Sequence, residues 1–154
     1  MKKFELTSEF VTNIFGTKLF RIKALVEFGN VEAGELGGYI EKEENLDHDG
    51  NAWVYGDARV YGNARVCGDA WVYGDAEVYG DADYAYAHGF GSINRTTTFF
   101  RLKDGGVGVR CGCFYGTLGE FREKVQETHG DGKLAQEYLM LADLMELRFT
   151  KEEG

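Results

Sequence analysis

Between residues 50 and 85, apolar and polar side chains alternate in a pattern that repeats every six residues without interruption. The consecutive units read GNAWVY, GDARVY, GNARVC, GDAWVY, GDAEVY and GDADYA. In the second unit Ala58 and Val60 are apolar, whereas Arg59 and Tyr61 are not. Such alternation is typical of a short strand with one buried face, and Gly followed by Asp or Asn is typical of a turn. The pattern therefore predicts one strand and one turn in every unit.

Units this short cannot bury an apolar face alone, so we expect them to wind and stack on one another. Each unit offers a small and an aliphatic residue for the interior, and Tyr84 is the one large departure at the aliphatic position. The absence of proline fits coils whose backbone forms hydrogen bonds along its whole length. The predicted inward residues are Val54, Val60, Val66, Val72 and Val78, with Ala52, Ala58, Ala64, Ala70, Ala76 and Ala82.

This run of units resembles the repeat of the hexapeptide-repeat left-handed β-helix proteins, in which three hexapeptides form one triangular coil. The resemblance implies a mainly β chain with a short left-handed parallel β-helix at its centre. With GELGGYIEKEENL at 34–46 and CGCF at 111–114, the layout is also similar to that of small proteins encoded by bacteriophages and prophages. That likeness implies a location in the host-cell cytoplasm and assigns no reaction.

A coil of 18 residues places each residue roughly 4.8 Å beneath the one 18 positions later. Outward residues at this spacing are aromatic over aromatic or positive over negative, as neighbouring strands favour. The predicted pairs are Trp53 with Trp71, Tyr55 with Tyr73, Tyr61 with Tyr79, Arg59 with Glu77 and Arg65 with Asp83. One face would then carry four neighbouring aromatic rings, and a patch of that kind normally marks an interaction site.

The segments that flank the repeat predict strands before it and a hairpin with two helices after it. Alternation at 4–6 and 19–25 indicates two strands, and the Gly-rich turn at 103–106 indicates a β-hairpin. Thr117–Glu120 has the pattern of a helix capping box, and a second apolar helical face follows over about 133–148. The predicted organisation is an N-terminal β cap at 1–33, the β-helix at 34–91 and a C-terminal β-hairpin and two-helix subdomain at 92–154.

Composition narrows the class of partner. The 154 residues include 17 Lys and Arg against 26 Asp and Glu, a formal net charge of −9. This excess argues against DNA, RNA or an anionic membrane surface as the partner, because phosphate binding favours a basic surface. No apolar run approaches the ~20 residues of a membrane span, and no secretory signal is expected at the N-terminus. Three cysteines fit reduced thiols in a cytoplasm.

The aromatic block provides the candidate binding site. Its rings could stack on nucleobases, with arginines nearby for phosphate; the alternative, which we favour, is that the C-terminal helices or a neighbouring subunit cover them. The residues predicted to bind a ligand or partner are Trp53, Tyr55, Trp71, Tyr73, Arg59 and Arg65. We therefore expect a non-enzymatic binding scaffold that acts on a host protein, with sequestration of a nucleotide signal as an alternative. The resemblance adds a homo-oligomer, with a trimer favoured.

Catalytic chemistry has weaker candidates. Many hexapeptide-repeat proteins are acyltransferases with a histidine base, and His88, beside Gly89, is the best candidate among His48, His88 and His129. The three histidines lie 40 and 41 residues apart, which does not match the zinc site of the carbonic anhydrases in that family. Acyl transfer stays a third functional alternative, and no catalytic residue is assigned.

Metal chemistry is also weakly indicated. Cys111 and Cys113 supply two thiols, which is too few for a zinc site, so a packed reduced pair is expected. The turn columns of Asp57 over Asp75 and Asn63 over Asp81 could chelate calcium, but turn capping explains the same side chains. We expect no metal and no cofactor.

Overall fold

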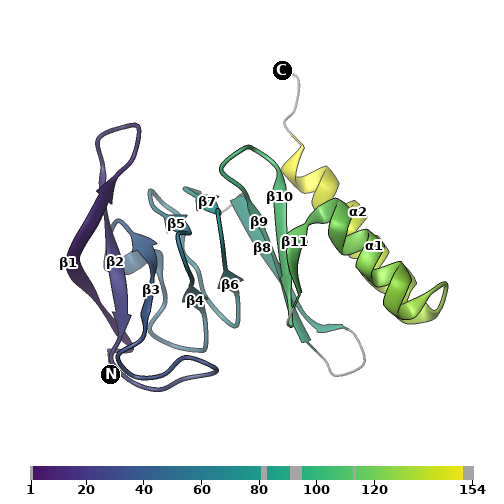
Figure 1. The fold of residues 1–154 in the computed structure, drawn as a ribbon, viewed down its shortest axis with the longest axis horizontal. Helices are drawn as coiled ribbons and strands as arrows, with labels where there is room; N and C mark the ends of the chain where they lie inside the picture. The colour runs from purple at the N-terminus through teal and green to yellow at the C-terminus, as the bar shows by residue number, and fades with distance from the viewer. Residues whose placement is uncertain (1, 81–82, 91–94, 113, 151–154) are drawn as a thin grey trace.

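The computed structural model describes residues 2–80, 83–90, 95–112 and 114–150, whose strands form three sheets beside two helices (Figure 1). The five-stranded sheet has the order β1 (Phe4–Thr12), β2 (Lys18–Ala24), β3 (Leu36–Ile40), β5 (Arg59–Val60) and β7 (Glu77–Val78). The two-stranded sheet pairs β4 (Trp53–Val54) with β6 (Trp71–Val72). The four-stranded sheet has the order β11 (Phe114–Thr117), β10 (Val107–Cys111), β9 (Arg95–Arg101) and β8 (Tyr84–Phe90). A 3₁₀ turn, η1 (Glu43–Asn45), and the helices α1 (Leu118–His129) and α2 (Lys133–Phe149) complete the described elements.

The predicted fold class, a mainly β protein built on a left-handed parallel β-helix, is wrong. The chain is a mixed α/β protein with separate and mostly antiparallel sheets, and its described strands form no continuous parallel solenoid. Among the described strands, β3 with β5, β5 with β7 and β4 with β6 pair in parallel, with only two residues paired in each case, and one isolated parallel bridge joins Leu46 to Val66. The physical reason is that these parallel ladders are very short, while the longer flanking strands pair antiparallel.

The local geometry of the repeat agrees with its pattern. Trp53 pairs with Trp71 and Arg59 pairs with Glu77 in parallel register, which confirms the 18-residue spacing. The chain turns at glycines with positive φ, such as Gly56 at 58° and Gly74 at 67°, a conformation that favours glycine. The inward residues within the described part are buried, which confirms their prediction: Ala52, Val54, Ala58, Val60, Ala64, Val66, Ala70, Val72, Ala76 and Val78. Ala82 lies outside the described residues.

The N-terminal segment extends the sheet of the repeat. β1 and β2 pair antiparallel, which confirms the two predicted strands. β2 then pairs antiparallel with β3, and β3 pairs in parallel with β5 of the repeat. As a result, Phe4, Ile22 and Ile40 share one hydrophobic core with the inward valines and alanines.

The C-terminal segment forms a second layered unit. β9 and β10 form the predicted hairpin, and Thr117 caps α1 in a capping box with Glu120. Residues 84–90, predicted as part of the coil, form β8 and pair antiparallel with β9. The two helices lie on the side of this sheet that faces away from the repeat (Figure 1) and share a core with Phe99 and Val109. The other side of the sheet therefore faces the aromatic residues of the repeat.

Candidate functional site

Trp53 is removed from the surface by the N-terminal segment. Its side chain is 0% exposed, and the rings of Phe28 and Phe4 lie 5.2 and 6.5 Å from it in edge-to-face arrangements. The indole Nε1 is buried and forms no hydrogen bond within the described part of the chain. The expected block of four neighbouring surface aromatics is therefore incomplete, because Trp53 belongs to the core.

The other three aromatic residues of the predicted site form a half-buried cluster. The ring of Tyr55 lies 5.4 Å from that of Trp71 and 5.5 Å from that of Tyr73. The four-stranded sheet covers part of the cluster, since the ring of Tyr115 on β11 lies 4.8 Å from Tyr73. The C-terminal helices, which we considered as the cover, lie on the opposite side of that sheet.

Arg110 on β10 is the cation that meets this cluster. Its guanidinium carbon lies 4.9 Å from the ring centre of Tyr73 and 5.6 Å from that of Trp71, within the range of a cation–π contact. The backbone N–H of Trp71 also donates a hydrogen bond of 3.0 Å to Thr98 Oγ1 on β9. The repeat and the four-stranded sheet are thus joined directly at the aromatic cluster.

The two arginines predicted for the site lie elsewhere. Arg59 forms an ion pair with Glu77 at 3.8 Å, as predicted. Arg65 pairs with Asp47 at 3.6 Å, and Asp83 pairs with Arg101 at 2.8 Å, so the predicted pairing of Arg65 with Asp83 is wrong. The reason is that the irregular segment before the repeat and β9 after it each bring a closer partner of opposite charge.

A cleft of about 280 Å³ lies where the repeat meets the four-stranded sheet. Trp71 and Arg110 line the cleft together with several polar side chains. Neither Arg59 nor Arg65 is among the lining residues. The lining residues are Gly29, Asn30, Asn51, Asp69, Trp71, Thr96, Arg110 and Gly112. Asn30 and Asn51 are exposed, whereas Asp69, Trp71 and Arg110 are half-buried. The cleft therefore combines an aromatic face, a cation and side chains that can donate or accept hydrogen bonds.

The charge of Arg110 is not neutralised by an ion pair within the described ranges. Its Nε atom is buried without a hydrogen-bond partner among the same residues, and none of the ion pairs found there involves Arg110. Its positive charge acts on Tyr55, where it opposes burial and the charge of Glu35; burial dominates and raises the pKa of Tyr55 to about 12. An arginine of this kind is available for an anionic group of a ligand.

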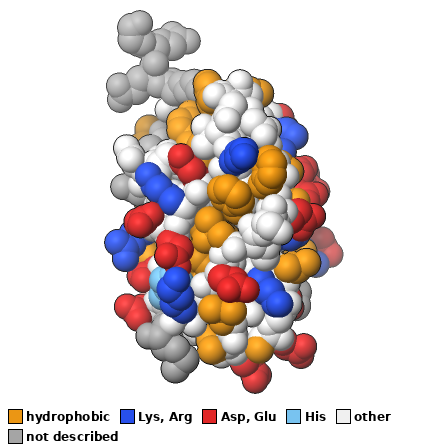
Figure 2. Space-filling model, turned by 90° about the vertical axis from the view of Figure 1, so that its left-hand side faces the viewer, with side chains coloured by type: hydrophobic (Ala, Val, Ile, Leu, Met, Phe, Trp, Pro, Cys, Tyr) orange, Lys and Arg blue, Asp and Glu red, His pale blue; other side chains and the backbone are white. Residues whose placement is uncertain are grey.

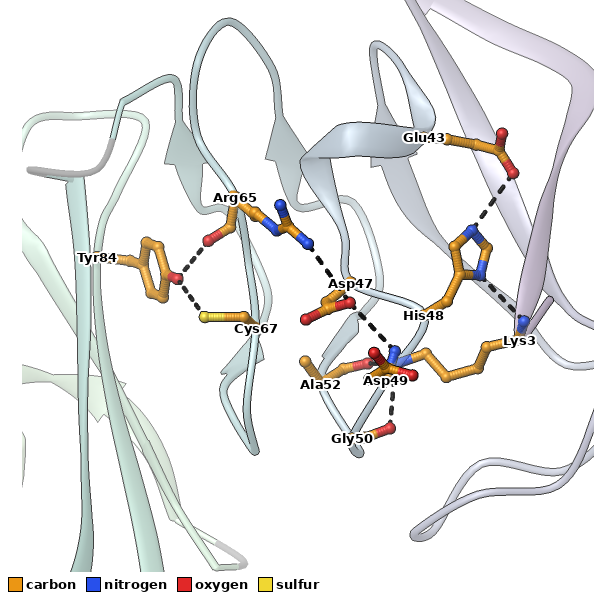
Figure 3. A network of polar contacts seen from close by, with 10 residues as sticks. All are labelled: Lys3, Glu43, Asp47, His48, Asp49, Gly50, Ala52, Arg65, Cys67 and Tyr84. Atoms are coloured by element: carbon orange, nitrogen blue, oxygen red, sulfur yellow. Dashed lines mark hydrogen bonds and ion pairs between the residues drawn. The ribbon is translucent and has the colours of Figure 1, made fainter. Parts of the chain in front are cut away.

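A separate polar network holds the N-terminal segment against the repeat (Figure 3). Lys3 Nζ donates hydrogen bonds to the carbonyl oxygens of Ala52 at 2.7 Å and Gly50 at 3.4 Å. The Lys3 backbone N–H donates to Nδ1 of His48 at 3.0 Å, and the imidazole stacks on Phe4 at 4.2 Å. Burial lowers the pKa of Lys3 to about 8, although Asp47 and Asp49 act in the opposite direction. Sequence reasoning missed Lys3, because one lysine beside the N-terminus carries no distinguishing pattern.

The same network continues on the other side of the repeat. Tyr84, the exception at the aliphatic position, donates its hydroxyl hydrogen to the carbonyl oxygen of Arg65 and lies 3.6 Å from Cys67 Sγ (Figure 3). Tyr84 therefore ends the repeat core with a ring whose polar atom has partners.

The histidines lie apart from one another. His48 Nε2 lies 3.3 Å from Glu43, so both its ring nitrogens have partners. His129 ends α1 and stacks on Tyr138 at 6.0 Å. His88 Nδ1 lies 2.6 Å from Oγ1 of Thr96, which lines the cleft. His88 is thus the histidine that lies beside the cleft, one residue removed from its wall.

The metal candidates are not brought together by the described part of the structure. Among those residues, no three His, Cys, Asp or Glu side chains gather in a way that could hold a metal ion. Asp81 and Cys113, which belonged to the calcium and thiol hypotheses, lie outside the described residues. Cys111 is buried, with its Sγ 3.2 Å from Thr97 Oγ1.

Comparison with known proteins assigns no family. No protein-family model matches the chain, and no curated protein matches it. Neither α1 nor α2 combines the length and the apolar character that crossing a membrane would require. The likeness to hexapeptide-repeat and phage proteins stays a prediction.

Proposed function

We propose that this protein is a non-enzymatic binding protein, and that its cleft binds a small ligand with a flat ring and an anionic group, of which a nucleotide is the representative class. The observation that carries this proposal is Arg110, a cation without an acidic partner among the described residues, stacked on Trp71 and Tyr73 at the wall of the cleft. In a chain with a net charge of −9, such an arginine is a local exception to the acidic surface.

The residues of the cleft match the parts of a nucleotide. The indole of Trp71 offers a face on which a base can stack, and such stacking contributes about 1–3 kcal/mol for each base. Arg110 would bind the phosphate through charge-assisted hydrogen bonds. The carboxylate of Asp69 has two acceptor oxygens, so guanine, whose N1–H and N2–H donors are adjacent, fits it better than adenine or uracil, which present a single donor group. A volume of about 280 Å³ is just below the range of about 300–1,000 Å³ that is typical of small-ligand sites, which favours a ligand no larger than a mononucleotide.

The proposal is tested by thermal shift and calorimetric titration with GMP, AMP, UMP and inorganic phosphate. We expect GMP to raise the melting temperature most, because a ligand that binds the folded state stabilises it. Arg110→Gln and Trp71→Ala should each abolish the shift. Arg65→Gln, which removes a charge outside the cleft, is the matched control and should keep it. Absence of binding by all three nucleotides at millimolar concentration would overturn the proposal.

Acetyl-coenzyme A in the same panel tests the acyltransferase alternative. That alternative is favoured only by the position of His88, which hydrogen-bonds Thr96 at the edge of the cleft. If the wild type transfers acetyl groups and His88→Ala does not, the protein is an acyltransferase and the proposal of a non-enzymatic binding protein is wrong. Transfer that survives in His88→Ala would exclude His88 as the base.

A second candidate function, a scaffold for a host protein, is favoured by an exposed apolar turn in the N-terminal segment. The turn between β1 and β2 exposes Ile14 at 93% and Phe15 at 76%. The side chain of Asn13 fixes this turn by accepting hydrogen bonds from the backbone N–H groups of Phe15 and Thr17 at 2.9 and 3.0 Å. Figure 2 shows hydrophobic side chains in a central stripe on this side, among charges of both signs. Apolar side chains on a fixed turn are suited to insertion into a pocket of a partner.

The scaffold proposal predicts a partner whose capture depends on this turn. Cross-linking in the lysate of a bacterial host, followed by mass spectrometry, should identify a protein that the wild type captures and the Ile14→Ser/Phe15→Ser variant does not. Equal capture by both proteins would contradict a role for the turn. The origin from a phage or prophage, the homotrimer and the cytoplasmic location belong to the same proposal.

A further inference from the structure

The cleft between the repeat and the four-stranded sheet has two chemically different ends. At the sheet end lie Arg110 and Thr96, which belong to β10 and β9. At the other end lie Asn30, in the turn between β2 and β3, and Asn51, in the first unit of the repeat. Among the described residues that line the cleft, Arg110 is the only Lys or Arg, so the asparagine end carries no positive charge.

The stacking of the backbone separates the two ends. The backbone N–H of Asn51 donates a hydrogen bond of 3.1 Å to the carbonyl oxygen of Gly68, so Asn51 lies one coil before Asp69. Trp71, in the same unit as Asp69, donates its backbone N–H to Thr98 on β9, so this unit lies next to the sheet. The layers therefore follow in the order of the asparagines, the unit of Asp69 and Trp71, and the sheet, with roughly 4.8 Å between neighbouring strands of the repeat.

The backbone also holds both asparagines in place. Asn30 lies in a tight turn that is closed by hydrogen bonds in both directions between Phe28 and Val31, at 3.0 and 2.8 Å. Val31 is buried and Phe28 packs against the core, so the turn is anchored. Gly29 brings this turn against the side chain of Asn51, since a Cβ atom at Gly29 would lie 3.5 Å from Asn51 Cβ. The two asparagines therefore lie on neighbouring segments of one wall of the cleft.

The side chains of both asparagines are exposed, and neither forms a hydrogen bond with another described residue. Asn45 provides the contrast, because it is buried and its Nδ2 donates to the carbonyl oxygens of Gly62 and Ala64 at 3.2 and 2.8 Å. Each amide offers two N–H donors and one acceptor oxygen. Asn30 and Asn51 are therefore available for uncharged polar groups of a ligand.

We propose that Asn30 and Asn51 bind the vicinal 2′- and 3′-hydroxyl groups of a ribose, so that the cleft prefers a ribonucleotide to a deoxyribonucleotide. This inference rests on the nucleotide site proposed above and adds the sugar to the base and the phosphate. A hydroxyl group both donates and accepts hydrogen bonds, and an amide can match it in both directions. With the 5′-phosphate at Arg110, a second phosphate on the ribose would meet no cation among the described lining residues. The expected ligand is therefore a 5′-monophosphate with both ribose hydroxyls free.

Calorimetric titration with GMP and with 2′-deoxy-GMP tests this inference. We expect 2′-deoxy-GMP to bind the wild type roughly three- to tenfold more weakly, because it lacks one hydroxyl group that forms hydrogen bonds. In the Asn30→Ala/Asn51→Ala variant the ratio of the two dissociation constants should fall to about one. Asn63→Ala is the matched control, since Asn63 has the same position in the third unit, is exposed and lies outside the cleft, and it should keep the ratio. Circular dichroism of each variant confirms that it folds.

The same titrations separate this inference from the proposed function. Equal affinity of the wild type for GMP and 2′-deoxy-GMP would overturn the role of the asparagines and leave the nucleotide site standing. An unchanged ratio in the Asn30→Ala/Asn51→Ala variant would do the same, because the preference would then come from other residues. Binding of neither nucleotide would overturn the proposed function, and this inference with it.

Discussion

Replacing Trp53 or Trp71 by alanine separates the roles that the same residue type has in the first and fourth units of the repeat. The two residues are register partners in β4 and β6, but Trp53 is fully buried beneath Phe28, whereas Trp71 is half-buried at the cleft. Truncation of a fully buried tryptophan costs about 3–5 kcal/mol, a large part of the ~5–15 kcal/mol that stabilises a domain. We expect Trp71→Ala to cost less than ~2 kcal/mol, because its ring is already partly in water.

Trp53→Phe refines the same prediction. The buried Nε1 of Trp53 has no hydrogen-bond partner within the described residues, and an unpaired buried donor costs about 1–3 kcal/mol. Phenylalanine removes that donor along with part of the packing, so the two effects partly cancel. We expect Trp53→Phe to lose much less stability than Trp53→Ala.

Urea unfolding followed by far-ultraviolet circular dichroism measures the free energy of unfolding of all three variants. The slope of that free energy with urea concentration should stay constant if each variant unfolds in one step. The reasoning is refuted if Trp71→Ala loses as much stability as Trp53→Ala, or if Trp53→Ala loses less than about 1 kcal/mol.

Three further predictions concern groups outside the cleft. The pKa of Lys3 is about 8 in the folded protein and 10.5 in the unfolded chain, so the free energy of unfolding should rise with pH between these values. The slope stays below about 1.4 kcal/mol per pH unit because the two states differ by at most one proton, and urea unfolding of Lys3→Met should show a smaller rise than the wild type. Thr117→Ala removes the acceptor for the Glu120 N–H, a hydrogen bond of 3.2 Å, and should cost about 1 kcal/mol, seen as a lower melting temperature; an unchanged value would contradict the role of the cap. Asp83→Asn leaves the mostly buried Arg101 without its counterion and should cost about 3 kcal/mol in chemical unfolding, whereas a loss of only a few tenths would show that water replaces the carboxylate.

The sequence predicted those features of the fold that depend on neighbouring residues. The inward positions of Val60 and Val78 and the 18-residue register follow from a short period with glycine at every turn. The capping box at Thr117 is equally local. The fold class could not be predicted in this way, because it depends on which strands pair across the chain. The pairing of β2 with β3 and of β8 with β9 gives longer antiparallel sheets than the repeat supplies.

In the candidate site, too, the sequence predicted the contacts within the repeat but not the contacts between distant segments. Spacing within the repeat identified Trp71 and Tyr73 as neighbours of Tyr55, and the structure places the three rings together. The same spacing could not show that Phe28 covers Trp53, nor that Arg110 lies over Trp71, because both contacts join segments that are distant in the sequence. Arg110 follows an ordinary strand pattern, and only the packing of β10 against the repeat distinguishes it.

Fluorescence of Trp71 tests the binding proposal most directly. The chain has two tryptophans, so Trp53→Phe leaves Trp71 as the single reporter in the cleft. If a base stacks on Trp71, titration with GMP should quench this fluorescence to saturation, inorganic phosphate alone should not, and Arg110→Gln should weaken the binding. Fluorescence that stays constant up to millimolar GMP, or that falls equally in Arg110→Gln, would contradict nucleotide binding in the cleft lined by Trp71 and Arg110.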